Sequence, residues 1–135
     1  MELLKVIQQS LDEPGFCRTL GIRAVSWDPN KRSLVLRMDK KADLEGGAGP
    51  GHMHGGAVGA FVDTAATFAL LACGVENCPT ANYRLDLLRP VFESGVTARA
   101  TVRRRGRLLA VVDVDVIDDA DRLVAIGRAT FAILD

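Results

Sequence analysis

Apolar residues follow two different periods along this chain, and each period predicts a type of secondary structure. A period of two residues, which is typical of strands, recurs in several segments. These segments are residues 20–27, 33–39, 80–88, 96–104, 108–117 and 123–133. Helical spacing occurs over residues 2–12, where it predicts a short amphipathic helix that ends near Pro14-Gly15.

The segment from Gly55 to Cys73 is apolar on every side and predicts a long helix, with Gly74 as a C-terminal cap. A helix of this kind either crosses a membrane or is enclosed by its own protein. Asp63 is its only ionisable side chain and lies near its middle. A charged group at that depth in a membrane is costly, so the enclosed arrangement is favoured and no membrane contact is expected.

One curved antiparallel sheet of about six strands can wrap such a helix. We therefore predict an α+β protein with a hotdog fold: a short N-terminal helix, and a long central helix wrapped by the sheet, in a single domain over residues 1–135. The small residues Ala125, Gly127 and Ala129 would let the sheet approach the helix backbone closely. The pattern alone leaves two other arrangements open, namely another α+β sheet with a helix on one face and a partly open barrel.

The composition excludes several classes of function. Lys plus Arg and Asp plus Glu each number 17, so the formal net charge is zero. Nucleic acid is not expected as a partner, because binding to phosphates usually requires a basic excess. The 3 cysteines contain no CxxC pair, which argues against a disulfide framework or a structural zinc site. The N-terminus does not resemble a secretory signal, so a cytoplasmic protein is expected.

Asp63 is the first candidate catalytic residue. Burial of a carboxylate without partners is costly, so its place in an enclosed helix calls for a reason. As a functional group it can activate water or attack a carbonyl directly. As a structural group it would line a subunit interface.

The tripeptide His54-Gly55-Gly56 lies where a glycine-rich loop over 45–53 becomes the long helix. A helix N-terminus offers free backbone N–H groups and a partial positive charge, so Gly55 and Gly56 can donate to a developing oxyanion. We expect His54 to position the start of the helix and His52 to close the loop. Their H-x-H spacing lacks a third nearby ligand, so no metal is expected.

The spacing of these residues predicts a dimer. Gly55 and Asp63 are eight residues apart in the sequence, which is about 12 Å along a helix axis. An oxyanion donor and an attacking group must both lie about 3 Å from one carbonyl, which one straight helix does not allow. Two antiparallel helices from two subunits can place Gly55 of one chain beside Asp63 of the other.

Thr80 begins the strand after the long helix, and alternation places its side chain on the same face as those of Asn82 and Arg84. Its hydroxyl can orient a water molecule beside the carboxylate, or it is only a strand threonine.

A cluster of arginines surrounds a predicted turn. It is made of Arg103, Arg104, Arg105 and Arg107 around Gly106. Such clusters are commonly solvated hairpin ends, and the functional alternative is that the arginines bind the phosphates of coenzyme A.

Three motifs now point to one family: HGGAVGAFVDTAATFAL, TANYRLDLLRP and RRRGRLLA. Together they resemble the phenylacetic-acid-degradation type of hotdog acyl-CoA thioesterase, from about residue 45 to the C-terminus. The resemblance implies hydrolysis of an acyl-CoA to a free acid and CoA, with CoA as part of the substrate and no other cofactor. It also implies homodimers, often paired into tetramers, with sites across the dimer interface.

The resemblance assigns roles residue by residue. Asp63 matches the catalytic carboxylate, acting as base or nucleophile, and Thr80 matches the Ser or Thr that helps to hold the water. Gly55 matches the backbone donor to the thioester carbonyl, and His54 the loop histidine beside it. The residues expected to contact substrate or CoA are Gly56, Asn82, Arg84, Arg104, Arg105, Gly106, Arg107 and Leu108.

The chain departs from this family at one position. Many members carry an Asn six residues before the loop histidine, whereas this chain has Ala48. Loss of one oxyanion donor costs about two to three orders of magnitude in rate. Either another group such as His52 substitutes, or activity is low, or the loop aligns differently. The departure also leaves open a non-catalytic hotdog protein that binds acyl-CoA. A hotdog dehydratase is disfavoured because the chain lacks the hydratase-type motif.

Overall fold

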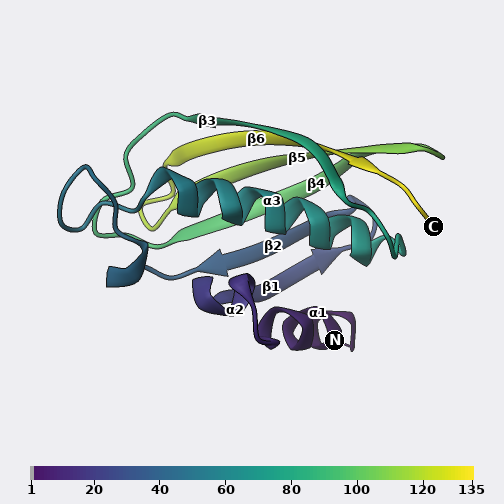
Figure 1. The fold of residues 1–135 in the computed structure, drawn as a ribbon, viewed down its shortest axis with the longest axis horizontal. Helices are drawn as coiled ribbons and strands as arrows, with labels where there is room; N and C mark the ends of the chain where they lie inside the picture. The colour runs from purple at the N-terminus through teal and green to yellow at the C-terminus, as the bar shows by residue number, and fades with distance from the viewer. Residues whose placement is uncertain (1) are drawn as a thin grey trace.

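A six-stranded sheet curves around one long helix in the computed structural model, which describes residues 2–135 (Figure 1). The strands are β1 (Ile22–Asp28), β2 (Ser33–Met38), β3 (Thr80–Leu87), β4 (Val96–Arg105), β5 (Leu109–Asp118) and β6 (Leu123–Ala132). Their order across the sheet is β1-β2-β4-β5-β6-β3, and every neighbouring pair is antiparallel. The helices are α1 (Glu2–Asp12), α2 (Phe16–Leu20) and α3 (Gly55–Ala72), with a short 3-10 helix η1 (Ala42–Leu44).

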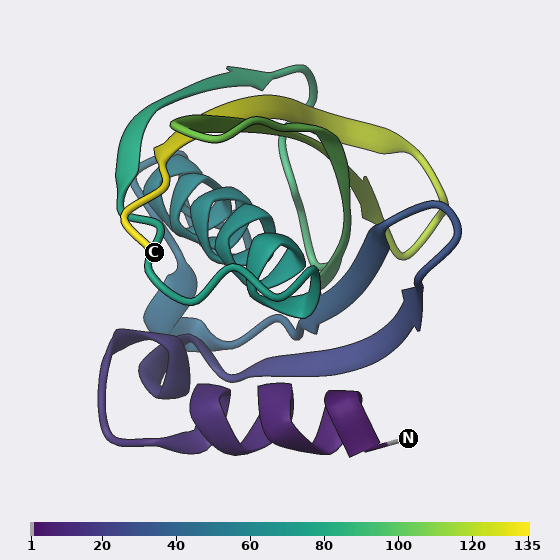
Figure 2. The ribbon, with the colours of Figure 1, turned by 90° about the vertical axis from the view of Figure 1, so that its right-hand side faces the viewer.

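Helix α3 lies inside the curl of the sheet, as the end-on view in Figure 2 shows. Its length and composition would also suit a membrane span, but half of its residues are buried inside the protein. Phe61, Val62 and Ala65 are fully buried against the inward side chains of the strands. The predicted hotdog fold is confirmed: the sheet wraps the central helix and is open, with β1 and β3 as its edges among the described residues.

The sheet approaches α3 most closely at β6. A Cβ atom added to Gly127 would lie 2.6 Å from Cγ1 of Val62, closer than a real Cβ can come. A larger residue at position 127 would therefore push the strand and the helix apart. The expectation that small residues of this strand allow a close approach is confirmed at Gly127.

Both ends of α3 are closed by local hydrogen bonds. At the N-terminus, Nδ1 of His54 accepts the N–H of Gly56 at 2.7 Å. At the C-terminus, Gly74 has a φ of +87°, and its N–H donates to the carbonyl of Leu71 at 3.0 Å. Gly74 is therefore the predicted terminator, because its left-handed conformation is one that glycine adopts without steric cost.

Two details of the predicted elements are wrong. The first strand does not begin at residue 20, because α2 ends there and Gly21 turns the chain at φ +72°. The strand predicted over 108–117 does not begin at Leu108, whose side chain is 70% exposed, because the turn extends through this residue and β5 begins at Leu109.

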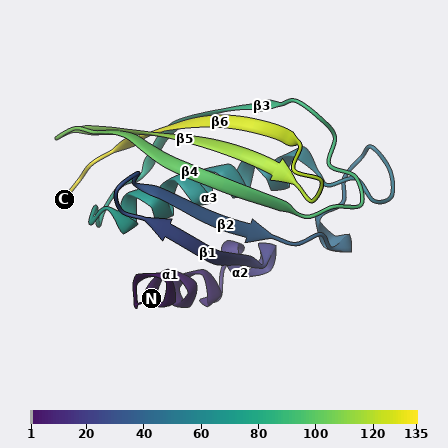
Figure 3. The same ribbon diagram turned by 180° about the vertical axis from the view of Figure 1, so that it is seen from behind.

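The outer face of the sheet has no helix over it in the described part of the chain. The view from behind shows β4, β5 and β6 running across this face, while α1 and α2 lie against the β1 end (Figure 3). The fold thus separates two surfaces, an inner one facing α3 and an outer one that is open.

Candidate active site

The side chains of Asp63 and Thr80 form a hydrogen bond. The hydroxyl of Thr80 donates to Oδ1 of Asp63 at 2.7 Å. Asp63 is partly exposed in the single chain, so the carboxylate lies at an open side of α3 rather than in the core. The sequence placed these two residues near one another, and the structure brings them into direct contact.

An irregularity in β3 aims Thr80 at the helix. Thr80 pairs with Phe131 of β6, but Asn82 pairs with Thr130, so the strand carries a β-bulge between them. Phe131 is fully buried and faces α3, and Thr80 beside it faces α3 as well. The prediction that Thr80 shares a face with Asn82 and Arg84 is therefore wrong, because the bulge reverses the alternation.

Strand β3 covers one stripe of α3, and its contacts follow the helix turn by turn. A Cβ at Gly59 would lie 3.2 Å from Leu85 and 3.3 Å from the hydroxyl of Tyr83. One turn earlier, a Cβ at Gly55 would lie 2.8 Å from Cδ1 of Leu87. The stripe ends at Asp63 one turn later, so two glycines allow the strand to lie close enough for Thr80 to reach the carboxylate.

Gly55 has an unused backbone donor at the start of α3. The N–H of Gly56 is paired with His54, whereas the N–H of Gly55 donates to no described residue. This difference corrects the prediction that both glycines can serve an oxyanion, and it leaves Gly55 as the available donor. His54 acts as the N-cap of the helix, as expected of a residue at the helix entry.

A cavity of about 280 Å³ borders Gly55. Its walls are mostly apolar and come from the loop, from α3 and from the chain after β3. The apolar wall residues are Ala48, Met53, Val58, Leu87, Leu88, Pro90 and Val91. This cavity was not predicted from the sequence. The paired leucines before Pro90 were a sign of it, and both are half exposed in the structure.

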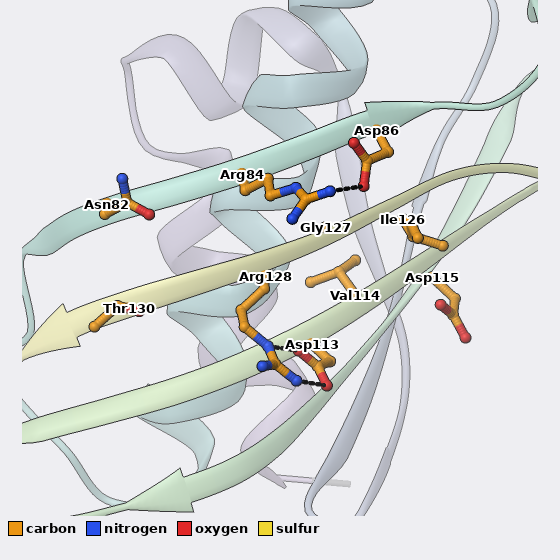
Figure 4. A pocket seen from close by; sticks show the side chains of 10 residues that line it. All are labelled: Asn82, Arg84, Asp86, Asp113, Val114, Asp115, Ile126, Gly127, Arg128 and Thr130. Carbon is orange, nitrogen blue, oxygen red and sulfur yellow. Dashed lines mark hydrogen bonds and ion pairs between the residues drawn. The ribbon is translucent and has the colours of Figure 1, made fainter.

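Asn82 and Arg84 lie on the other side of the sheet, at a separate hollow of about 490 Å³ (Figure 4). Arg128 and Asp113 form a two-pronged ion pair across the same hollow, with N–O distances of 2.6 and 2.9 Å. The hydrogen bonds from Arg128 hold the pKa of Asp113 below its usual range. The outer hollow is thus separated from the Asp63 site by the sheet itself.

The arginine hairpin lies at the opposite end of α3 from Gly55. Arg105 donates from Nη1 to the carbonyl of Cys73 at 3.0 Å, so one predicted ligand-binding arginine also caps the helix. Arg104 folds over Gly106, and the side chain of Arg107 is exposed. The 18 residues of α3 separate this hairpin from the cavity by about 27 Å.

The described residues contain no cluster of three or more potential metal ligands. The chemistry that the site offers comes from one carboxylate, one hydroxyl and one helix-end N–H. These are the groups that acyl transfer to water requires: a base, a means to hold the water, and an oxyanion donor.

Comparison with known proteins identifies the family. Residues 50–125 match the model of the thioesterase superfamily, which is more than half of the chain. The acyl-coenzyme A thioesterase PaaI of Escherichia coli is 31% identical over 114 residues, which cover 82% of this chain and 76% of that protein. The chain belongs to the thioesterase superfamily, and this membership supports hydrolysis of thioesters.

Solved structures agree with this assignment. The structure of the E. coli PaaI protein superposes with a TM-score of 0.84 and 26% identity, covering 99% of this chain and 95% of that one. A thioesterase from Pseudomonas aeruginosa superposes with a TM-score of 0.86 and 26% identity, covering 96% of this chain and 91% of that one. The predicted resemblance to the PaaI-like hotdog thioesterases is therefore confirmed.

Proposed function

We propose that the protein hydrolyses acyl-CoA thioesters to a free acid and CoA, at a site that two subunits share. The observation that carries the proposal is the separation of Gly55 from the Asp63–Thr80 pair on one straight helix. The eight-residue interval spans about 12 Å, too far for both to meet one carbonyl. A second α3, running antiparallel beside the first, brings Asp63 of the partner subunit to the Gly55 end.

The reaction needs only the groups already described. Asp63 of one subunit removes a proton from water while the water oxygen bonds to the thioester carbonyl carbon. The hydroxyl of Thr80 donates to the carboxylate, and its oxygen accepts a hydrogen bond from the water. The N–H of Gly55 stabilises the negative oxygen of the tetrahedral intermediate. The carbon–sulfur bond then breaks, and the thiolate of CoA takes up the proton held by Asp63. Water and acyl-CoA are thereby converted into acid and CoA, and no further cofactor is required.

Two exposed features support the dimer. Strand β3 is a sheet edge with mostly exposed residues, and edge strands of this kind readily pair with another chain. On α3, Ala60, Asp63 and Thr67 form a partly exposed stripe that continues from Gly56. A partner that pairs through β3 would bring its own α3 against this stripe. Pairing of two such dimers into a tetramer is part of the same proposal, by analogy with the family.

Recognition of CoA is supported by the arginine hairpin. Arg104 and Arg107 are exposed, and neither forms an ion pair with a described residue. Their guanidinium groups can bind the phosphates of CoA through paired hydrogen bonds. The E. coli relative is named for hydrolysis of acyl-coenzyme A, which agrees with this assignment.

A second candidate function is binding of acyl-CoA without hydrolysis. Ala48 favours it, because a methyl group borders the cavity where many family members supply an amide. A protein of this kind would keep the pocket and the hairpin but would turn over slowly or not at all.

A thiol-release assay over a panel of acyl-CoAs separates the two candidates. We expect turnover of at least one acyl-CoA, and a loss of about a hundredfold or more in kcat for Asp63→Asn. The same acyl groups on a short thiol that lacks the nucleotide should show a higher KM. Tight binding of every acyl-CoA with no thiol release would favour the binding protein, and undiminished turnover by Asp63→Asn would contradict the proposed mechanism.

A further inference from the structure

The cavity beside Gly55 is bordered by a histidine ring with an unpaired nitrogen. Nδ1 of His52 is closed off from solvent and has no hydrogen-bond partner among the described residues. The backbone of His52 is held on both sides, since its N–H donates to Gly49 and its carbonyl accepts from Gly46. Buried polar atoms are nearly always hydrogen-bonded, so this ring calls for an explanation.

The unpaired nitrogen determines which edge of the ring can donate. Of the two ring nitrogens only Nδ1 is buried without a partner, so Nε2 lies at the more open edge of the ring. Because His52 borders the cavity, we take Nε2 as the nitrogen that a bound ligand can reach. Nδ1 is unpaired in either neutral tautomer of the ring, but a buried N–H without an acceptor is rarer in proteins than a buried acceptor without a donor. The network therefore assigns the proton to Nε2, and His52 presents an N–H donor to the cavity.

We propose that His52 is a second oxyanion donor, acting with Gly55 on the thioester oxygen. This role rests on the proposed hydrolysis and replaces the amide that Ala48 lacks. As the carbonyl oxygen gains negative charge, the Nε2–H of His52 donates a hydrogen bond to it without transferring its proton. The bond relaxes when the carbon–sulfur bond breaks and the carbonyl forms again, so no proton is gained or lost by the ring.

The ring is also held in place before a substrate binds. His52 packs against Phe92, with ring centroids 4.8 Å apart and an interplanar angle of 47°. Among the described residues, the one other polar side chain at this cavity is that of Arg89, which is exposed and would lose more rotamer freedom on binding. A fixed donor costs less to organise around the transition state than a mobile one, so His52 suits the role better.

Kinetics of variants test this role. We expect His52→Phe, which keeps an aromatic ring but removes the donor, to lower kcat about a hundredfold with KM changed by less than about threefold. His52→Gln, which restores an N–H near the position of Nε2, should recover much of that loss. Ala48→Asn in the His52→Phe background should also restore kcat, because it supplies the missing amide. The matched control is Gly47→Ala in the same loop, which should leave kcat nearly unchanged because nothing lies within 4 Å of the added Cβ.

The outcomes separate this inference from the proposed function. If Asp63→Asn loses activity while His52→Phe retains it, the role of His52 is refuted and the proposed hydrolysis stands. If Asp63→Asn retains activity, the proposed mechanism fails whatever His52 does. Should His52→Phe prove unstable, nitrogen NMR of the unsubstituted protein still decides, because the chain has only 2 histidines. A neutral ring with its proton on Nε2 supports the inference, and a proton on Nδ1 of His52 overturns it.

Discussion

Thr80 touches Asp63 because one extra residue interrupts β3. The hydroxyl–carboxylate distance is 2.7 Å, and the register shift between Thr80 and Asn82 turns the threonine toward α3. A regular strand would have pointed the same hydroxyl to the outer face of the sheet, where Asn82 and Arg84 lie. The bulge therefore directs the hydroxyl of Thr80 in β3 to the carboxylate of Asp63 in α3.

This contact predicts the behaviour of Thr80 variants. Thr80→Val has a similar shape but no hydroxyl, so kcat should fall about tenfold or more through loss of a hydrogen bond to a charged group. Thr80→Ser keeps the hydroxyl and should stay within about threefold of the unsubstituted enzyme. Steady-state kinetics on one acyl-CoA checks both. Equal kcat values for Thr80→Val and Thr80→Ser would show that the contact between Thr80 and Asp63 has no catalytic role.

Substitution of Gly127 should destabilise the fold. Its added Cβ would lie 2.6 Å from Cγ1 of Val62 and 3.1 Å from the carbonyl of Arg84, so Gly127→Ala should cost about 1–3 kcal/mol of unfolding free energy. Gly47→Ala is the control, because nothing lies within 4 Å of the added atom. Chemical denaturation measures both, and Val62→Ala should relieve part of the cost in the double variant. Equal stabilities of Gly127→Ala and Gly47→Ala would contradict the close approach of β6 to α3.

Asp118 should make the stability of the protein depend on acid pH. The backbone N–H of Arg122 donates to its carboxylate at 2.9 Å and, with the side chain of Arg122 and the N–H of Ala120, holds the pKa of Asp118 below its usual range. A lowered pKa in the folded state stabilises the protein above the unfolded pKa of about 4, and the stabilisation is lost as the pH falls through the folded value.

The expected result is a difference between Asp118 and its amide. Asp118→Asn should melt at a lower temperature than the unsubstituted protein at neutral pH, and the gap should narrow as the pH falls below about 4. Thermal melts over this range provide the measurement. A gap that stays constant or widens toward acid pH would contradict the assigned cause.

Two arginines of the hairpin should differ in their effects. Arg105→Met removes the hydrogen bond to the carbonyl of Cys73 and should lower the melting temperature slightly. Arg107→Met removes only an exposed charge and should leave stability unchanged. It should raise KM for acyl-CoA and weaken the salt dependence of KM, because it loses a phosphate contact. A KM for Arg107→Met equal to that of the unsubstituted enzyme would leave Arg107 without a role in binding.

The sequence predicts the fold well because the pattern of α3 admits few solutions. A helix that is apolar on every side must be wrapped, and the alternating segments supply the sheet. The two errors in the elements occur where one residue decides the local conformation. Gly21 ends α2 through its positive φ, and α2 itself is only 5 residues long, too short to show a period.

The site was predicted less completely, for a physical reason. The positions of Asp63, Gly55 and His54 along one helix follow from helix geometry, and residue spacing in the sequence is enough to predict them. The direction of Thr80 depends on a bulge, and the bulge depends on pairing with a strand some fifty residues later. The orientation of the His52 ring depends on its packing against Phe92. Phe92 is forty residues away in the sequence, so no local pattern predicts this contact.

The shared site is tested most directly by mixing two inactive variants. Gly55→Pro removes the backbone donor at the first helical position, where proline is tolerated, and the extended conformation of His54 (φ −61°, ψ 134°) suits a following proline. Gly55→Ala is the matched control, since it adds a Cβ beside Leu87 but keeps the N–H.

Mixed dimers of Gly55→Pro and Asp63→Asn carry one site with both substitutions and one site with neither. After unfolding and refolding together, such mixtures should recover about a quarter of the unsubstituted activity if each site takes Gly55 from one chain and Asp63 from the other. A mixture that stays as inactive as either variant alone would contradict the account, because the two groups would then act within one subunit.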